Sequence, residues 1–60
     1  MDNETQIIVI AGQTVGIAYD PEAGIWYARS STVPGLAAEA ASASELIEEL
    51  QVAVRILNLP

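Results

Sequence analysis

The side chains of this sequence that can take part in chemistry are carboxylates, hydroxyls and two arginines. The 60 residues include no histidine, cysteine or lysine, so the common pairs of a nucleophile with a base are absent. The one remaining arrangement is a carboxylate metal site formed by Asp20, Glu22 and Glu39. Asp20 and Glu22 flank a turn proline and Glu39 belongs to another element, which is the pattern of solvated surface charges. We therefore expect no enzymatic activity, no catalytic residue, no bound metal and no cofactor.

The charge balance argues against nucleic acid and membranes as partners. Eight acidic and two basic residues give a formal net charge of −6. Phosphate backbones and anionic lipids both require clusters of lysine or arginine. An acidic surface keeps a small protein in solution, and it also suits a basic protein partner.

The sequence carries no sign of export or of a membrane anchor. Residues 1–4 are acidic where a secretory signal would begin basic, and no apolar run approaches the roughly 20 residues that span a bilayer. The lack of cysteine is compatible with a reducing compartment. We expect a cytoplasmic protein.

The length of the chain favours self-association. A single domain of about 60 residues buries only about 60% of the surface that its unfolded chain exposes, and it needs an additional source of stability. Without cysteine there is no disulfide, and without histidine a structural metal is disfavoured. The hydrophobic content of 52% is more than one small core needs. We therefore expect a homo-oligomer, either a dimer or a larger assembly.

The first expected element is a strand over residues 6–19, after a frayed terminus at residues 1–5. Its first half is apolar on both faces, because Ile8 and Ile10 are as apolar as their neighbours, and one layer of helix covers only one face. Gly12 suggests a bulge or bend that either splits the run into two strands or redirects one long strand. A contact between subunits at Ile8 and Ile10 is the other explanation, and the one that we favour.

A turn and a second strand follow. Asp-Pro-Glu-Ala-Gly, at residues 20–24, has the residues of a hairpin loop, and a strand is expected over residues 25–31. Trp26 and Ala28 fit the face towards a helix, and Tyr27 and Arg29 fit the outer face, although the reverse phase stays open. Tyrosine and arginine are common at the centres of interfaces, so these two outer residues are candidates for protein contacts.

The last part of the chain predicts a turn, a short strand and a helix. Pro34 and Gly35 fit the centre of a type II turn, and a short strand is expected over residues 36–41. Ser-Ala-Ser-Glu at residues 42–45 matches a capping box, and apolar residues then recur at helical spacing over residues 43–58. The expected fold is α+β: a three-stranded antiparallel sheet, its first strand extended or bent, with one C-terminal helix packed on one face.

The residues of this central region resemble a known family. The pattern comprises Tyr-Asp-Pro-Glu-Ala-Gly-Ile-Trp-Tyr-Ala at residues 19–28, Ser30, Val-Pro-Gly-Leu at residues 33–36, Glu39-Ala40 and Glu45-Leu46. It resembles the DUF1902 family of small domains of unknown function and, more distantly, the N-terminal domain of HicB-type antitoxins. The resemblance implies the partial RNase H-like sheet and helix of those antitoxins and a homo-oligomer, without nuclease chemistry. The sequence departs from the family at Tyr19, where tryptophan is usual, and at Thr32, where an acidic residue is usual.

Two functions are compatible with these residues. The first is a non-catalytic protein-interaction domain, a HicB-like antitoxin or a stand-alone relative, which self-associates and binds a basic protein such as a HicA-like toxin. HicB antitoxins usually add a DNA-binding segment after the helix, and we expect no nucleic-acid binding by this chain alone. The alternative is a small-molecule or metal-responsive binding or assembly domain, suggested by the carboxylates and the apolar first strand. The candidate interface residues are Ile8, Ile10, Tyr27 and Arg29.

Overall fold

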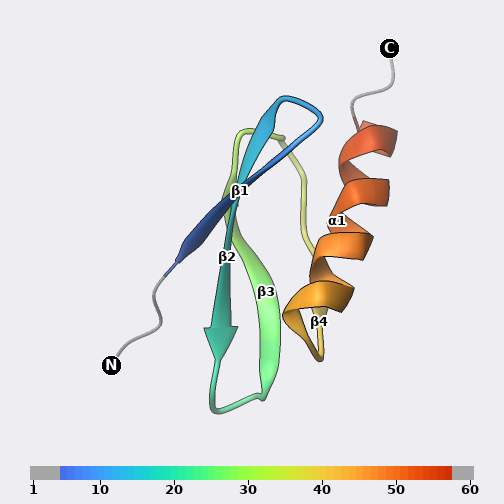
Figure 1. Ribbon diagram of the computed structural model, residues 1–60. Coiled ribbons are helices and arrows are strands. Elements are labelled where there is room, and N and C mark those ends of the chain that lie inside the picture. Colours follow the sequence, from blue (N-terminus) through green and yellow to red (C-terminus); the bar gives the residue numbers. More distant parts are fainter. Residues whose placement is uncertain (1–4, 58–60) are drawn as a thin grey trace.

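The computed structural model describes residues 5–57 as a meander of antiparallel strands followed by one helix (Figure 1). The elements are β1 (Gln6–Ile10), β2 (Gln13–Asp20), β3 (Ile25–Ser31), β4 (Glu39–Ala40) and α1 (Ala43–Leu57). Each strand pairs with the next one in the chain, so the sheet order is β1-β2-β3-β4. The helix lies on one face of the sheet, and no element within residues 5–57 covers the other face. The predicted α+β class and the order of strands before helix are confirmed.

The strand expected over residues 6–19 is two strands joined by a tight turn. Ala11 and Gly12 form the turn, with φ values of 52° and 80°. Positive φ at both central residues is characteristic of a type I′ turn, whose twist matches that of the strands it joins. The reversal pairs Ile10 with Gln13 and Ile7 with Gly16. The change of direction suggested by Gly12 is therefore a complete hairpin, and residues 1–4 of the expected frayed terminus lie outside the described residues.

A subunit contact was expected at Ile8 and Ile10 because one helix layer cannot cover both faces of the first strand. The hairpin shows that these two side chains instead face the helix of their own chain. Ile8 pairs with Val15, so the two side chains share the face towards α1. Ile10 is only 8% exposed and belongs to the core, while Ile8 is half-buried against it. The helix layer thus covers these side chains within one chain. The side chains of β1 that lack cover are Ile7, which is 61% exposed, and Val9, which is 71% exposed.

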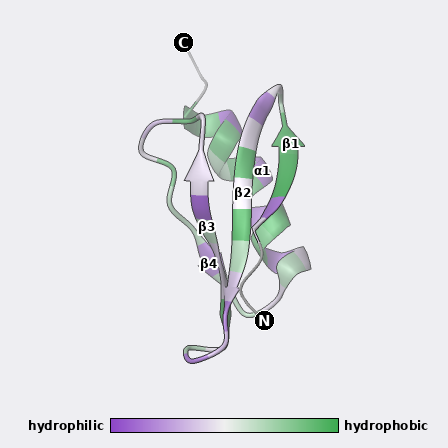
Figure 2. Ribbon diagram, turned by 90° about the vertical axis from the view of Figure 1, so that its left-hand side faces the viewer, coloured by the Kyte–Doolittle hydropathy of each residue, from purple (hydrophilic) through white to green (hydrophobic). Residues whose placement is uncertain are grey.

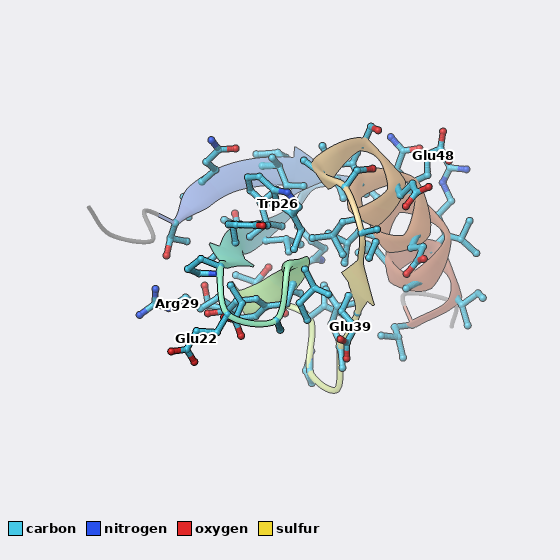
Figure 3. All side chains as sticks on the ribbon, turned by 90° about the horizontal axis from the view of Figure 1, so that it is seen from below. Glu22, Trp26, Arg29, Glu39 and Glu48 are labelled. Carbon is cyan, nitrogen blue, oxygen red and sulfur yellow. The ribbon has the colours of Figure 1, made fainter. Side chains whose placement is uncertain are left out.

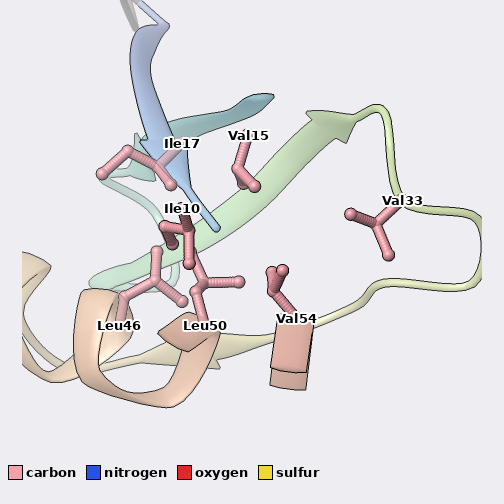
Figure 4. Close-up of a cluster of buried hydrophobic side chains, with 7 residues drawn as sticks. All are labelled: Ile10, Val15, Ile17, Val33, Leu46, Leu50 and Val54. Carbon is pink, nitrogen blue, oxygen red and sulfur yellow. The ribbon is translucent and has the colours of Figure 1, made fainter. Parts of the chain in front are cut away.

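The core lies between the sheet and one stripe of α1. The helix buries Leu46, Leu50 and Val54 at intervals of four residues, which places them on one side of a 3.6-residue turn. The buried side chains that form the core are Ile10, Val15, Ile17, Val33, Leu46, Leu50 and Val54 (Figure 4).

Trp26 lies on the helix side of β3, as the favoured phase predicted. Trp26 and Ala28 both pack against the core. The Trp26 ring lies with its centroid 5.4 Å from that of Tyr19, at a tilt of 49°, because the two residues are paired across β2 and β3. Tyr27 pairs with Ala18 and lies on the opposite face. The register with β2 shifts between Ala28 and Ser30, and from this bulge the Arg29 side chain reaches Thr5 on that same outer face.

Local hydrogen bonds account for both predicted turns. The Asp20 carboxylate accepts from the amides of Glu22 at 3.0 Å and Ala23 at 3.3 Å, and Gly24 closes the loop with a φ of 69°. In the second turn the amide of Leu36 donates to the carbonyl of Val33 at 3.3 Å, and Gly35 has a φ of 79°. This is the type II geometry expected around Pro34 and Gly35.

The helix begins at the predicted residue. The Ser42 hydroxyl accepts from the amide of Glu45 at 3.2 Å, which is the capping contact predicted by the sequence. The expected strand over residues 36–41 is shorter than predicted, with only Glu39 and Ala40 in β4. Its approach is still tied to the sheet, because the amide of Ala28 donates to the carbonyl of Ala38 at 3.0 Å.

Candidate functional site

Tyr27 and Arg29 lie on the face of the sheet that α1 does not cover. Tyr27 is paired with Ala18 on one side and with Glu39 on the other. The Arg29 side chain is exposed, and its guanidinium donates to the hydroxyl of Thr5 at 3.3 Å. The structure therefore places these two candidate residues on one surface, away from the candidates Ile8 and Ile10.

The middle of this outer face is closed by the side chains of neighbouring strands. Gly16 and Ala18 of β2 are both buried, although no helix covers them. A Cβ atom at Gly16 would lie 2.6 Å from the Ser30 hydroxyl and 2.9 Å from a methyl carbon of Thr5. Because Gly16 has no side chain, the side chains of Ser30 and Thr5 can lie over β2 at this position. What remains accessible and apolar on this face is its margin along β1, where Ile7 and Val9 project.

We call this margin the neutral edge, defined as the β1 strand with its exposed side chains Ile7 and Val9. Residues 5–19 contain no charged side chain. β1 is hydrophobic over most of its length (Figure 2), and it is an outermost strand of the sheet. The neutral edge therefore combines exposed apolar side chains with a strand that has only one neighbour within the described residues.

The carboxylates gather at the other end of the molecule. The β2–β3 turn, β4 and the beginning of α1 lie close together in Figure 1, and β4 is paired with the first residues of β3. We call this region the acidic end, and its carboxylates are Asp20, Glu22, Glu39, Glu45, Glu48 and Glu49. Seen from this end in Figure 3, Glu22 and Glu39 project on one side of the molecule, while Glu48 projects from the helix on another. The acidic end is thus a spread of separate exposed charges.

The carboxylates considered for a metal site come from the β2–β3 turn and from β4. Asp20 accepts two backbone hydrogen bonds within its own turn, and Glu39 lies on β4 across from Tyr27. Within residues 5–57, no group of three or more histidine, cysteine, aspartate or glutamate side chains is placed to hold a metal ion. The same part of the chain contains no detectable pocket. None of its helices is long and apolar enough to span a membrane.

The family model for DUF1902, a domain of unknown function, matches residues 13–58. The chain belongs to the DUF1902 family. The match extends from the start of β2 through α1 and includes the Asp-Pro-Glu-Ala-Gly turn, Trp26 and the Pro-Gly-Leu segment, on which the resemblance was based. Comparison of this DUF1902 domain with curated proteins found no match, and comparison with solved structures found none either.

The sequence does not predict the exposed pair Ile7 and Val9, because one continuous strand over residues 6–19 would place both on the same face as Val15. The usual signals for a two-residue hairpin loop between two apolar runs are Asn-Gly, Asp-Gly and Gly-Gly, and Ala-Gly is not among them. With the hairpin at Ala11 and Gly12, Ile8 and Ile10 instead share the face of Val15. In this DUF1902 domain, β1 also lies outside the matched residues 13–58.

Proposed function

We propose that this DUF1902 domain is a non-catalytic, cytoplasmic protein-interaction domain, a HicB-like antitoxin or a stand-alone relative. It self-associates, and it binds a basic protein, such as a HicA-like toxin, through the acidic end. The observation that carries the proposal is the separation of charge from apolar surface. Six carboxylates occupy the acidic end, whereas residues 5–19 carry no charge.

The acidic end has the chemistry that a basic protein recognises. Exposed carboxylates accept charge-assisted hydrogen bonds from lysine and arginine, and a field of one sign accelerates encounter with an oppositely charged surface. Glu45, Glu48 and Glu49 lie in the first two turns of α1, where the helix dipole also favours negative charge. A basic partner therefore gains from several weak contacts spread over the turn, β4 and the helix.

The resemblance of residues 19–46 to HicB-type antitoxins supports the choice of partner. HicB-like antitoxins act by binding a toxin protein, so a HicA-like toxin encoded beside this gene is the first partner to test. Tyr27 and Arg29 are the other contact candidates in this proposal, because they lie on the same sheet face as Glu39.

The experiment measures binding of such a toxin to the wild-type chain and to two charge variants. The double variant Glu22→Gln with Glu39→Gln removes two charges from the acidic end, and we expect it to weaken binding about tenfold. The control, Ile56→Lys with Leu57→Lys, raises the net charge by the same two units at exposed positions in the last turn of α1, where neither lysine is within four residues of a glutamate. We expect this control to change affinity less than about threefold.

Two results would contradict the proposed partner. The first is no binding of the toxin to the wild-type chain at micromolar concentrations. The second is an equal loss of affinity in both variants, because that would assign binding to net charge rather than to the acidic end.

A further inference from the structure

The direction of the backbone groups along β1 is determined by its neighbours. The amide of Thr14 donates to the hydroxyl of Thr32 at 3.0 Å, and its carbonyl accepts from the amide of Thr32 at 2.9 Å. The backbone N–H and C=O groups of Thr14 therefore point towards β3 and away from β1. Thr14 and Val9, which are opposite each other in β2 and β1, thus form a non-hydrogen-bonded pair. Because an antiparallel ladder alternates, Ile7 and Gly16 form the next such pair. The N–H and C=O groups of Ile7 and Val9 thus point outward from the sheet.

This open edge lacks the features that usually protect one. Natural edge strands are blocked by proline, by lysine or other charges, by bulges, or by being very short. β4, at the other margin of the sheet, is only two residues long. β1 has five residues, and its sequence Gln-Ile-Ile-Val-Ile has no proline and no charge. The two edges of the sheet therefore differ, and β1 is the edge that can pair with a strand of another chain.

We propose that β1 pairs antiparallel with β1 of a second copy of this chain, about a two-fold axis at Ile8. This register uses the whole strand, because it places Gln6 opposite the partner's Ile10 and Ile7 opposite the partner's Val9. Ile7 and Val9 then form the hydrogen-bonded pairs, with four N–H to C=O bonds across the axis. Two four-stranded sheets become one continuous sheet.

The side chains along β1 suit this arrangement. Ile7 and Val9 meet their counterparts on the outer face, which reduces the exposure of the most accessible apolar residues of the strand. Ile8 meets the partner's Ile8 on the helix side, where it is only half-buried in one chain. The predicted contact at Ile8 is therefore retained, whereas Ile10 is already covered by its own helix.

Charge favours a second copy over other occupants of this edge. The molecule has a formal charge of −6, so two copies repel each other wherever acidic surfaces approach. The neutral edge has no charge between residues 5 and 19, so pairing here brings no carboxylate of the described part against another. A basic partner is instead attracted to the acidic end, and both contacts can be made at once.

The area limits the strength of the dimer. A standard interface buries about 800 Å² on each partner, which is about a fifth of the 3925 Å² surface of this chain. One five-residue edge strand supplies less than that. We therefore expect a dissociation constant of about 1–100 µM.

This inference rests on the self-association in the proposed function and is independent of the basic partner. It is tested by sedimentation of Val9→Pro against the wild-type chain. Because the N–H of Val9 faces outward, proline removes a donor of the dimer and no donor of the β1–β2 ladder. We expect the dissociation constant of the dimer to rise at least about tenfold, while the circular dichroism spectrum stays that of the folded chain.

Two controls separate backbone pairing from loss of apolar surface. Val9→Thr keeps the N–H and the β-branched shape, and we expect it to weaken the dimer by no more than about threefold. Val52→Lys changes a valine that is 58% exposed on α1, and we expect it to leave dimerisation unchanged. Should Val9→Pro fail to fold, amide hydrogen exchange of the wild-type chain provides the test, with protection of Ile7 and Val9 expected to increase with protein concentration.

The outcomes distinguish the site from the wider function. A folded Val9→Pro variant that dimerises as tightly as the wild type overturns pairing through β1 but leaves self-association standing. Exchange at Ile7 and Val9 that does not depend on concentration in a dimeric sample also overturns it. A wild-type chain that stays monomeric well above 100 µM overturns both this inference and the self-association, while toxin binding is judged by its own measurement.

Discussion

Ala11 is the described non-glycine residue with a positive φ, and at 52° it lies in the left-handed region. In this region the Cβ atom comes too close to the following carbonyl oxygen, which costs roughly 1–2 kcal/mol per residue in a left-handed helix. The neighbouring Gly12, with a φ of 80°, carries no such penalty. Ala11 therefore accepts local strain so that β1 can fold back on β2.

We expect Ala11→Asn to stabilise the chain. Asparagine tolerates positive φ better than alanine, and Asn-Gly is a preferred pair for a type I′ turn. The expected gain in the free energy of unfolding is about 0.5–1 kcal/mol, which corresponds to a rise of several degrees in the melting temperature. Thermal unfolding followed by circular dichroism measures it.

The matched control for this substitution is Ala37→Asn. Ala37 is exposed, lies outside the helix and strands, and is not among the residues with positive φ. Its change is expected to stay within about 0.5 kcal/mol. Equal effects of the two substitutions would show that the turn conformation of Ala11 is not strained.

The beginning of α1 depends on the hydroxyl of Ser42. The Ser42 hydroxyl accepts from the amide of Glu45 at 3.2 Å, which satisfies one of the amides that the first turn of a helix leaves unpaired. The helix in turn supplies Leu46, Leu50 and Val54 to the core. Loss of the cap therefore weakens the element on which the whole core depends.

We expect Ser42→Ala to lower the free energy of unfolding by about 1 kcal/mol. Urea denaturation measures the change. Ser44→Ala is the control, because the exposed Ser44 hydroxyl contacts that of Ser42 at 3.4 Å rather than capping an amide, and alanine suits a helix at least as well as serine. A loss for Ser44→Ala as large as that for Ser42→Ala would contradict the capping role.

The elements that the sequence predicted well are those set by local chemistry. The turn at Asp20 to Gly24 follows from the Asp20 carboxylate and the conformation of glycine, and the helix start follows from Ser42. The hairpin at Ala11 and Gly12 was less accessible, because alanine is an unusual residue for the first position of a type I′ turn. The strand β4 is short because only Glu39 and Ala40 pair with β3. The extent of this pairing is not specified by any local sequence signal.

For the candidate site, the alternation along the first part of β3 predicted the outer placement of Tyr27, which pairs with Ala18. The register with β2 shifts beyond Ala28, at a bulge, and Arg29 is on the outer face because its guanidinium reaches Thr5 there. The phase of β1 relative to β2 could not be obtained in the same way. A two-residue reversal changes which positions share a face, so Ile7 and Val9 became the exposed pair. The carboxylates of the acidic end are far apart in the sequence. They lie near one another because β4 and the beginning of α1 pack beside the β2–β3 turn (Figure 1).

The described part of the chain has one layer of helix on a sheet of four strands. The residues of the described part that keep large apolar side chains exposed include Ile7, Val9, Val52 and Ile56. A chain of 60 residues buries only a small core and is marginally stable. Covering part of this exposed apolar surface with a second copy would increase its stability. The acidic end and the neutral edge are at different places on the surface, so self-association leaves the carboxylates accessible to a basic protein.

We propose that this DUF1902 domain functions by association, and sedimentation equilibrium of the wild-type chain measures its self-association. The measurement covers about 1–300 µM at physiological salt, a range chosen to bracket the dissociation constant expected for a small interface. We expect the weight-average mass to rise from the 6.3 kDa of one chain to twice that value as concentration increases. A mass that stays at 6.3 kDa over the whole range would contradict self-association of this domain.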